Sequence, residues 1–394
     1  LEFRRVLFRS RMSEEAVSTP TEKKKTPIGV LILWITLFLV SGTCSLIFGK
    51  LLYQTPSIGR YGQTENFQKP WFSNFIMFFG MSFLFIGFEI NACKIEKKIK
   101  SNPEHAATAW NAENKRPIKS VYYKVFAPAF CDFLASFIMF VGLLWIDVSI
   151  WQMIRGSIII FTGLIRQFWL KKPLKASEWV ALGVIFLSLA VVGVAQLLTP
   201  KQQQTEPVPV GKMVLGMVLV FVAQGIQALQ TVIEEHLLQG IEAPANMVVG
   251  MEGVWGFVLT AFVALPIAYF LPGEEGSGLH EDFIDSLYLC KNSMTVLTLN
   301  ILSVVVLLVF NLSSMRVTLY TNSVVRNLLE PFRTFLVWAT AVFIHYFIDK
   351  KYGEGLTVYS WLQLAGFVIL SIGMLMFNGT IKCGKEKKEE VKES

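Results

Sequence analysis

Long apolar runs alternate with short polar connectors along most of this chain, and the runs at 180–198 and 213–222 are typical of them. A helix that crosses a bilayer core needs roughly 20 mostly apolar residues. Segments of adequate length fall at 28–52, 72–92, 121–145, 150–170, 177–198, 211–237, 246–271, 293–315, 320–347 and 357–380. This pattern predicts an all-α integral membrane protein with about ten transmembrane helices.

The two halves of this helical region resemble each other in outline. The fourth segment carries Arg155, and a lysine pair and Trp179 follow it. The ninth segment carries Arg326, and a lysine pair and Trp361 follow it. Each half has an odd number of predicted helices, so the second half must lie inverted in the bilayer relative to the first. Inverted repeats place the substrate site near the midplane, between the halves.

Polar segments flank and separate the halves. Residues 1–11 have the character of a translated cloning adapter ahead of a start at Met12, and we leave them out of the fold prediction. The expected parts of the chain are an adapter-like segment at 1–11, a cytosolic tail at 12–27, a first five-helix repeat at 28–198, a linker at 199–210, a second five-helix repeat at 211–380 and a charged cytosolic tail at 381–394.

Composition supports the membrane assignment and limits the partners. Hydrophobic residues make up 53% of the chain and charged residues 16%, whereas a soluble domain has about 25% charged residues. The formal charge of +7 owes much to four arginines in the adapter-like segment, so no nucleic-acid partner is expected. The other lysines and arginines gather in the connectors and tails of one side, which the positive-inside rule places in the cytosol with both termini.

The sequence lacks motifs for enzymatic chemistry or metal binding. Its five cysteines and four histidines are scattered, without the ligand spacing of a metal site. It has no His-Glu-x-x-His or Gly-x-Ser-x-Gly pattern, the signatures of common hydrolases. We therefore expect no cofactor and no enzymatic activity.

Polar stripes run along the fourth, sixth and ninth segments. A charge at membrane depth costs at least about 2.5–3.5 kcal/mol, so it needs a partner or a water-filled cavity. The expected solute ligands on these stripes are Gln152, Arg155, Gln224, Gln227, Asn322, Arg326 and Arg333. The expected coupling groups or charge partners are Asp132, Glu234, Glu252 and Glu330.

Each stripe also has a structural interpretation. Arg326 and Glu330 are four residues apart on one helix face and can neutralise each other. Arg333 lies nearer a helix end and can extend to the lipid headgroups, and the glutamines can join helices by hydrogen bonds. Arg155 differs, since no acidic residue lies within a helical turn of it on its own segment. The glycine repeat at 250–256 predicts close helix packing.

Several stretches carry a family resemblance: FAPAFCDFLASFIMF at 126–140, WQMIRGSIIIFTGL at 151–164, VAQGIQALQTVIEE at 222–235, FNLSSMRVT at 310–318 and PFRTFLVWA at 331–339. They resemble the F subfamily of solute carrier family 35, within the drug/metabolite transporter superfamily. The chain departs from that pattern at Glu330–Pro331. The resemblance implies ten helices in two inverted repeats, cytosolic termini and alternating access around a central cavity. The matching motif positions are Asp132, Gln152, Arg155, Glu234, Glu235 and Arg333.

These observations favour a secondary transporter that moves a small anionic or polar organic solute, nucleotide-sugar-like or another metabolite, across an endomembrane. Arg155 and Arg326 are the expected anion ligands, because a guanidinium binds carboxylate or phosphate through two parallel hydrogen bonds. Glu234 is the expected coupling carboxylate. The expected partners are the solute and the lipid bilayer, with a homodimer or a membrane-protein partner left open. The membrane is that of the Golgi, the lysosome or vacuole, or another organelle.

A non-transporting scaffold is the alternative hypothesis. Such a protein recruits partners through the charged loop at 94–119 and the C-terminal tail, and its polar stripes pack tightly against one another. A cavity at the midplane discriminates between the two functions.

Overall fold

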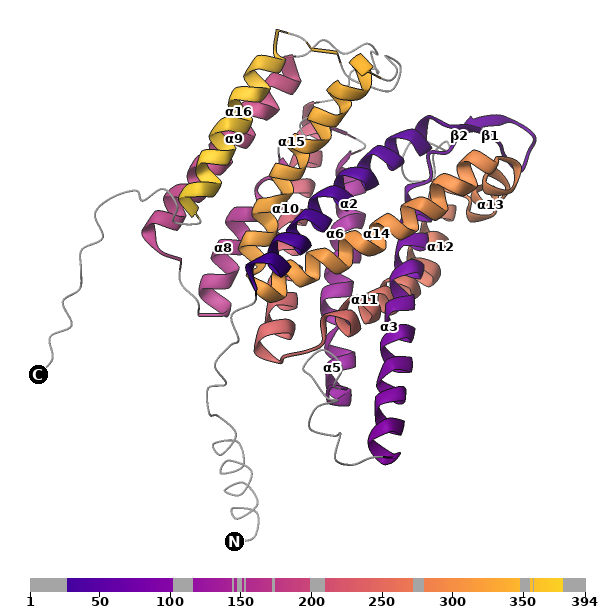
Figure 1. The fold of residues 1–394 in the computed structure, drawn as a ribbon. Coiled ribbons are helices and arrows are strands. Elements are labelled where there is room, and N and C mark those ends of the chain that lie inside the picture. Colours follow the sequence, from indigo (N-terminus) through magenta and orange to yellow (C-terminus); the bar gives the residue numbers. More distant parts are fainter. Residues whose placement is uncertain are drawn as a thin grey trace, which may run out of the picture.

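The computed structural model describes residues 27–101, 116–143, 145–146, 151, 154–171, 174–198, 210–271, 280–347, 355–356 and 358–377. The predictions for the adapter-like segment, both tails and Gln152 lie outside these residues, as does nearly all of the linker prediction. The described chain is a bundle of long helices with one small β-hairpin at one end (Figure 1).

The elements before the central gap are mostly helices. They are α2 (Ile28–Gln54), β1 (Pro56–Ile58), β2 (Thr64–Asn66), α3 (Pro70–Ser101), α5 (Lys119–Lys124), α6 (Phe126–Leu143), α8 (Ile158–Trp169) and α9 (Ala176–Leu198). Strands β1 and β2 pair antiparallel, with Ser57 opposite Glu65.

The elements after the gap include two short π-helical turns, η2 and η3. They are α10 (Val210–Glu235), η2 (His236–Gly240), α11 (Ala245–Leu259), η3 (Thr260–Ala264), α12 (Leu265–Phe270), α13 (Phe283–Asn292), α14 (Met294–Tyr320), α15 (Ser323–Phe347) and α16 (Ser360–Phe377). All ten segments expected from the sequence coincide with helices or runs of helices. The hairpin and α13 are additional elements that the apolar pattern did not predict.

Seven stretches of the described chain are long and apolar enough to cross a membrane: Ile28–Gln54, Pro70–Ser101, Lys119–Gly142, Val210–Gly240, Ala245–Phe270, Met294–Tyr320 and Ser360–Phe377. Helix α15 is as long as these but carries Arg326, Glu330 and Arg333. Helix α8 is apolar but short. The chain is therefore an integral, multi-pass membrane protein.

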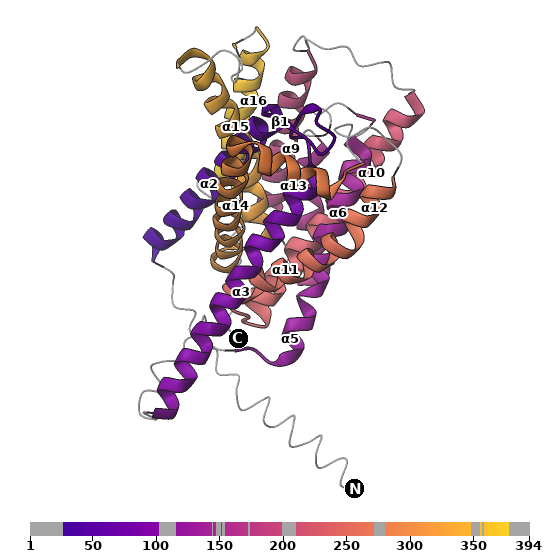
Figure 2. The ribbon, with the colours of Figure 1, turned by 90° about the vertical axis from the view of Figure 1, so that its right-hand side faces the viewer.

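Helices from the two halves pack side by side throughout the bundle. The most extensive contacts join α3 with α11, α6 with α10, α9 with α16, and α2 with α14. A smaller contact joins α8 with α15. Figures 1 and 2 show two of these pairs, α9–α16 and α3–α11, as neighbours in both views. The first and second halves are thus interleaved rather than separate.

Glycines allow several of these close approaches. A Cβ atom on Gly250 or Gly253 of α11 would overlap the backbone of α3, and one on Gly256 would overlap the Phe78 ring. Gly142 of α6 and Gly216 of α10 face each other, and a Cβ on either would lie 2.8–2.9 Å from the other's carbonyl oxygen. The packing role predicted for the glycine repeat at 250–256 is confirmed, since only small residues permit such contact.

Candidate functional site

The last turns of α10 carry the central ion pair of the bundle. Glu234, whose side chain is 1% exposed, accepts a bond from the Arg326 guanidinium of α15 on one carboxylate oxygen. Its other oxygen accepts from the Gln230 amide nitrogen at 2.9 Å. The sequence brings Gln230 onto the same face as Glu234, one helical turn earlier. Arg326 thus has its carboxylate partner on α10.

Two more carboxylates lie around this ion pair. Glu252 of α11 shares a hydrogen bond with Glu234 and also senses Asp132 and Arg326 electrostatically. Asp132 of α6 interacts electrostatically with Glu234 and Arg326. Glu252 is buried and Asp132 half-buried. The structure therefore joins three of the four expected charge partners, from α6, α10 and α11, around the Arg326 guanidinium.

A second ion pair lies farther along α15. Arg333 contacts Glu330 at 2.6 Å, one helical turn away, and its guanidinium lies over the Phe310 ring of α14 at 5.0 Å. The same guanidinium donates to the Gly42 carbonyl of α2 at 3.4 Å, and Gly42 has room for it only because it lacks a Cβ. Arg333 is buried among helices in this structure, so it does not extend to the headgroups.

Arg155 lies just before α8 and forms no ion pair with a carboxylate among the described residues. Its guanidinium lies over the Trp151 ring at 4.6 Å from the centroid. Glu330 and Arg333 are the charges that act on it electrostatically. Within the ranges that the structure describes, no hydrogen bond or ion pair engages it. This group therefore holds two positive charges, on Arg155 and Arg333, and one negative charge, on Glu330.

The remaining expected ligands have structural contacts. Asn322 precedes α15 and accepts a bond from the Val325 amide at 2.9 Å, so it caps that helix. Gln224 is buried and donates to the Met139 sulfur at 3.1 Å. Gln227 is half-buried on the same helix. Glu330 contacts Arg333, and Arg326 contacts Glu234, in place of the neutralisation within α15 that the spacing suggested.

Another ion pair and its hydrogen bonds connect α8, α10 and the start of α15. Arg166 of α8 contacts Glu235 of α10 at 3.2 Å. The other Glu235 oxygen accepts from the Ser323 backbone amide at 3.0 Å and from its hydroxyl at 2.7 Å. Ser323 is the first residue of α15, so Glu235 stabilises the positive end of that helix dipole.

At the hairpin end, Lys69 and Asp285 form a salt bridge at 2.7 Å with both side chains at most 2% exposed. Asp285 also accepts from the Arg60 backbone amide at 2.6 Å. Glu281 accepts from the Trp71 and Phe72 amides at 2.9 and 2.6 Å, which caps α3. We call this set of contacts between the 56–72 region and α13 the hairpin clasp.

The contacts of the hairpin clasp keep the Asp285 carboxyl group ionised. Burial of the Asp285 carboxyl would raise its pKa, but bonds from the Arg60 amide and the Lys69 ammonium outweigh burial and hold the pKa below its usual value. No sequence pattern predicts this pairing, because Lys69 and Asp285 are 216 residues apart.

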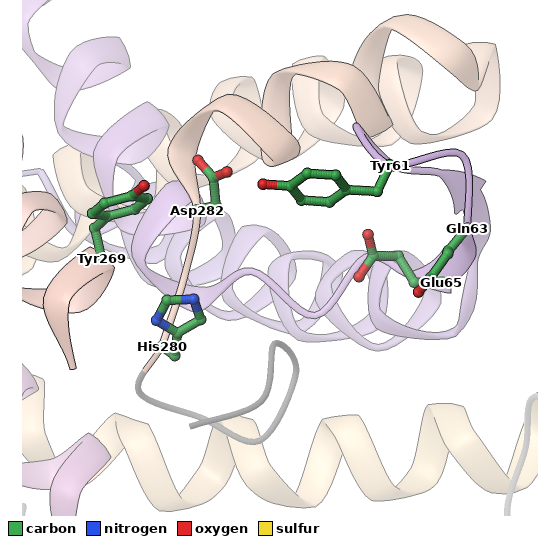
Figure 3. A pocket seen from close by; sticks show the side chains of 7 residues that line it. Tyr61, Gln63, Glu65, Tyr269, His280 and Asp282 are labelled. Atoms are coloured by element: carbon green, nitrogen blue, oxygen red, sulfur yellow. The ribbon is translucent and has the colours of Figure 1, made fainter. Parts of the chain in front are cut away.

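A pocket of about 540 Å³ opens beside the clasp (Figure 3). Its lining is mostly polar and comes from the hairpin, from α12 and from the residues that precede α13: Gly59, Tyr61, Gln63, Glu65, Tyr269, His280 and Asp282. None of the expected site residues of α8, α10 or α15 lines this pocket.

Close polar contacts join the three expected stripes. The Asn327 amide of α15 donates to the Thr162 hydroxyl of α8 at 2.7 Å and to the Thr231 hydroxyl of α10 at 3.2 Å. Arg166, Glu235 and Ser323 connect the same helices. The stripes face one another, as their spacing predicted, and they are packed in this structure.

These features define a multi-pass α-helical membrane protein with ion pairs buried between its two halves. Its relatives include solute carrier family 35 member F6 of Rattus norvegicus, 29% identical over 351 residues, and of Homo sapiens, 27% identical over 348 residues; each match covers 87% of both chains. A Schizosaccharomyces pombe protein described as uncharacterized is 31% identical over 265 residues, or 66% of this chain and 76% of that protein. The chain is a homologue of solute carrier family 35 member F6.

Two further comparisons complete this picture. No protein-family model matches the chain. A solved crystal structure aligns over 90% of this chain and 99% of its own with a TM-score of 0.52 at 11% identity, which shows a shared fold alone.

Proposed function

We propose that this protein is a secondary transporter, not an enzyme, that moves a small anionic or polar organic solute across an endomembrane by alternating access. The observation that carries the proposal is Arg155, a half-buried guanidinium that lies over the Trp151 ring and has no hydrogen bond or ion pair among the described residues. A cation at membrane depth without an anion is costly. An anionic solute supplies the missing charge.

Arg155 and Arg333 form the core of the proposed solute site. Their guanidiniums are planar and permanently charged, so they suit the two-pronged recognition of carboxylate or phosphate. Glu330 neutralises one of them in the empty site, at 2.6 Å from Arg333. Gln152, Gln227 and Arg326 remain proposed ligands of the same solute.

The helix contacts support two inverted five-helix repeats. A two-fold axis in the membrane plane would exchange α2 with α10, α3 with α11, α6 with α14, α8 with α15, and α9 with α16. Under that exchange the contact of α6 with α10 becomes the contact of α14 with α2, and the other three pairs map onto themselves. All five contacts occur in the fold. Inverted repeats of this kind place the substrate between the halves.

The hairpin clasp supports the proposed topology. Cytosolic termini and ten crossings put the 53–69 and 271–293 connectors on the same, non-cytosolic side. The hairpin and α13 belong to those connectors and contact each other through Lys69 and Asp285. The basic 94–119 loop then lies on the cytosolic side, in agreement with the positive-inside rule.

Homology to solute carrier family 35 member F6 supports transport in general and leaves the solute to experiment. A thermal-shift screen of the purified protein against nucleoside monophosphates, nucleotide sugars, amino acids and short peptides identifies a binder, because a ligand stabilises the state that binds it. Proteoliposome uptake of that binder then tests the site. Arg155→Gln should reduce uptake about tenfold or more, since a hydrogen bond to a charged group contributes about 1.5–3 kcal/mol.

The control removes a positive charge elsewhere. Lys97→Gln changes an exposed lysine at the far end of α3 and should leave uptake unchanged. Equal uptake by wild type and Arg155→Gln would contradict the proposed site.

A scaffold function is the second candidate, and the packed stripes favour it. The Asn327 amide donates directly to the Thr162 and Thr231 hydroxyls of the other two stripes. A scaffold predicts no uptake of any compound in the screen by the wild-type protein, together with binding of a partner protein to the 94–119 loop.

A further inference from the structure

The carboxylates around Arg326 outnumber the cations. Asp132, Glu234 and Glu252 all interact with this one guanidinium. Fully ionised, the cluster would carry two negative charges in excess inside the helical bundle. Each uncompensated buried charge costs several kcal/mol. A positively charged ligand must therefore accompany the cluster.

Two buried acceptors in this cluster lack a donor among the residues that the structure describes. They are Oε1 of Glu252 and Oε1 of Gln230, in residues that are 6% and 7% exposed. The Gln230 amide lies at the cluster, since its nitrogen donates to Glu234. Unpaired buried acceptors cost about 1–3 kcal/mol each. Both atoms accept a hydrogen bond once a donor enters, and a proton bound to a carboxyl supplies that donor.

A metal ion is a weaker candidate for the missing charge. Among the residues with described positions, no group of three or more histidine, cysteine or acidic side chains has the geometry to hold one. A hydrogen bond between two carboxyl groups, in contrast, needs a proton on one of them. Glu234 and Glu252 share such a bond.

Two charged groups on neighbouring helices have partners outside the cluster. On α3, Glu89 pairs with Arg116 at 2.6 Å. On α14, Arg316 donates to Asn246 at 2.9 Å. The titratable groups that face the cluster are Cys131 and Asp132 from α6, Glu234 from α10, Glu252 from α11, and Arg326 and Glu330 from α15.

We infer that Glu234 and Glu252 form a proton-binding pair that determines whether Arg326 is available to the solute; this rests on the proposed transport function. In the empty protein, Asp132 and Glu252 each carry a proton, which cancels the two excess negative charges, and Glu252 donates its proton to the Glu234 carboxylate, which holds Arg326. A further proton from the compartment neutralises Glu234 and weakens its bond to Arg326. The freed guanidinium charge then binds the anionic solute. The proton leaves with the solute on the opposite side, so one proton and one negative charge cross together.

Infrared difference spectroscopy of the full-length protein in lipid nanodiscs tests the pair without a solute. Spectra in mildly acidic and mildly basic buffer should differ by the carbonyl band of a buried, protonated carboxyl group. Glu252→Gln and Glu234→Gln should each alter or remove this band, because glutamine has the shape of the protonated acid but no titratable proton. The control, Glu242→Gln, changes an exposed carboxylate on the loop that follows η2 and should retain it.

The outcomes separate the proton site from transport. An unchanged band in both Glu234→Gln and Glu252→Gln overturns the proposed pair, even if the wild-type protein transports. A band that both variants lose supports the pair, and zero uptake in the same preparation then contradicts the transport proposal alone. If a glutamine variant does not fold, Glu252→Asp keeps the acid at a shorter length, and the band must then shift in frequency.

Discussion

The hairpin clasp and the Arg326 cluster are both buried sets of charged groups, yet they differ in whether their buried acceptors have donors. In the clasp, the Asp285 oxygens accept from the Lys69 ammonium at 2.7 Å and the Arg60 amide at 2.6 Å. In the cluster, three carboxylates surround Arg326, and Oε1 of Glu252 has no hydrogen bond to any residue that the structure describes. Both Asp285 oxygens therefore have a donor, whereas the cluster contains a buried acceptor that lacks one.

This difference distinguishes a structural contact from a candidate functional one. A buried pair with its bonds made stabilises one arrangement, and removing either partner leaves a charge stranded. A cluster with excess charge of one sign is stable only with a ligand, so ligand binding and release can change its arrangement. We therefore expect the clasp to fix the fold at one end of the bundle and the cluster to change during transport.

The largest effect should follow from breaking the clasp. Lys69→Met strands the Asp285 carboxylate at a site that is at most 2% exposed, and removing one partner of a buried pair costs about 3–5 kcal/mol. Thermal unfolding of the detergent-purified protein measures this loss. The matched control is Lys69→Met with Asp285→Leu, which should recover most of the stability because no charge is stranded. A double variant as unstable as the single one would contradict the account.

Acid should weaken the clasp by a smaller amount. The pKa of Asp285 is held below its ordinary value of 3.8 by the Arg60 amide and the Lys69 ammonium, against the effect of burial. A lowered pKa in the folded state means that the stabilisation is complete above 3.8 and declines as the pH falls through the lowered value. The clasp should stay intact at the pH of any cellular compartment. Hydrogen exchange of the hairpin amides checks this, and opening in mildly acidic buffer would contradict it.

Arg60→Gln should have a lesser effect still. The Arg60 side chain is 41% exposed, and its guanidinium lies 3.5 Å from Asp282. Exposed ion pairs contribute about 0–1 kcal/mol, and the variant keeps the backbone amide that bonds to Asp285. The unfolding temperature should change little, and a loss as large as that of Lys69→Met would show that the side chain carries the clasp.

Glu252→Gln should have the smallest effect on stability, and its sign should be reversed. Glutamine has the shape of the protonated acid and keeps a donor for the Glu234 carboxylate, but it cannot ionise and add a negative charge to the cluster. We expect unchanged or slightly raised thermal stability at neutral pH. Clear destabilisation would mean that the Glu252 carboxylate is already balanced by a fixed partner.

The sequence predicted the helices and the polar faces well, because both follow from local periodicity. The ten apolar segments and the charges of α15 could be placed from spacing alone. The partners could not, because they depend on helix packing. Arg326 has an acid four residues away on its own helix, yet it pairs with Glu234, 92 residues away. The hairpin was missed because its strands have three residues each, too few for an alternating pattern.

Arg155 contacts the solute in the proposed mechanism, whereas Arg60 of the clasp does not. The measurement that tests this claim most directly is the solute-induced shift in unfolding temperature for wild type, Arg155→Gln and Arg60→Gln, with the binder found in the screen. We predict that Arg60→Gln keeps the wild-type shift and that Arg155→Gln loses it. An undiminished shift in Arg155→Gln would contradict the claim.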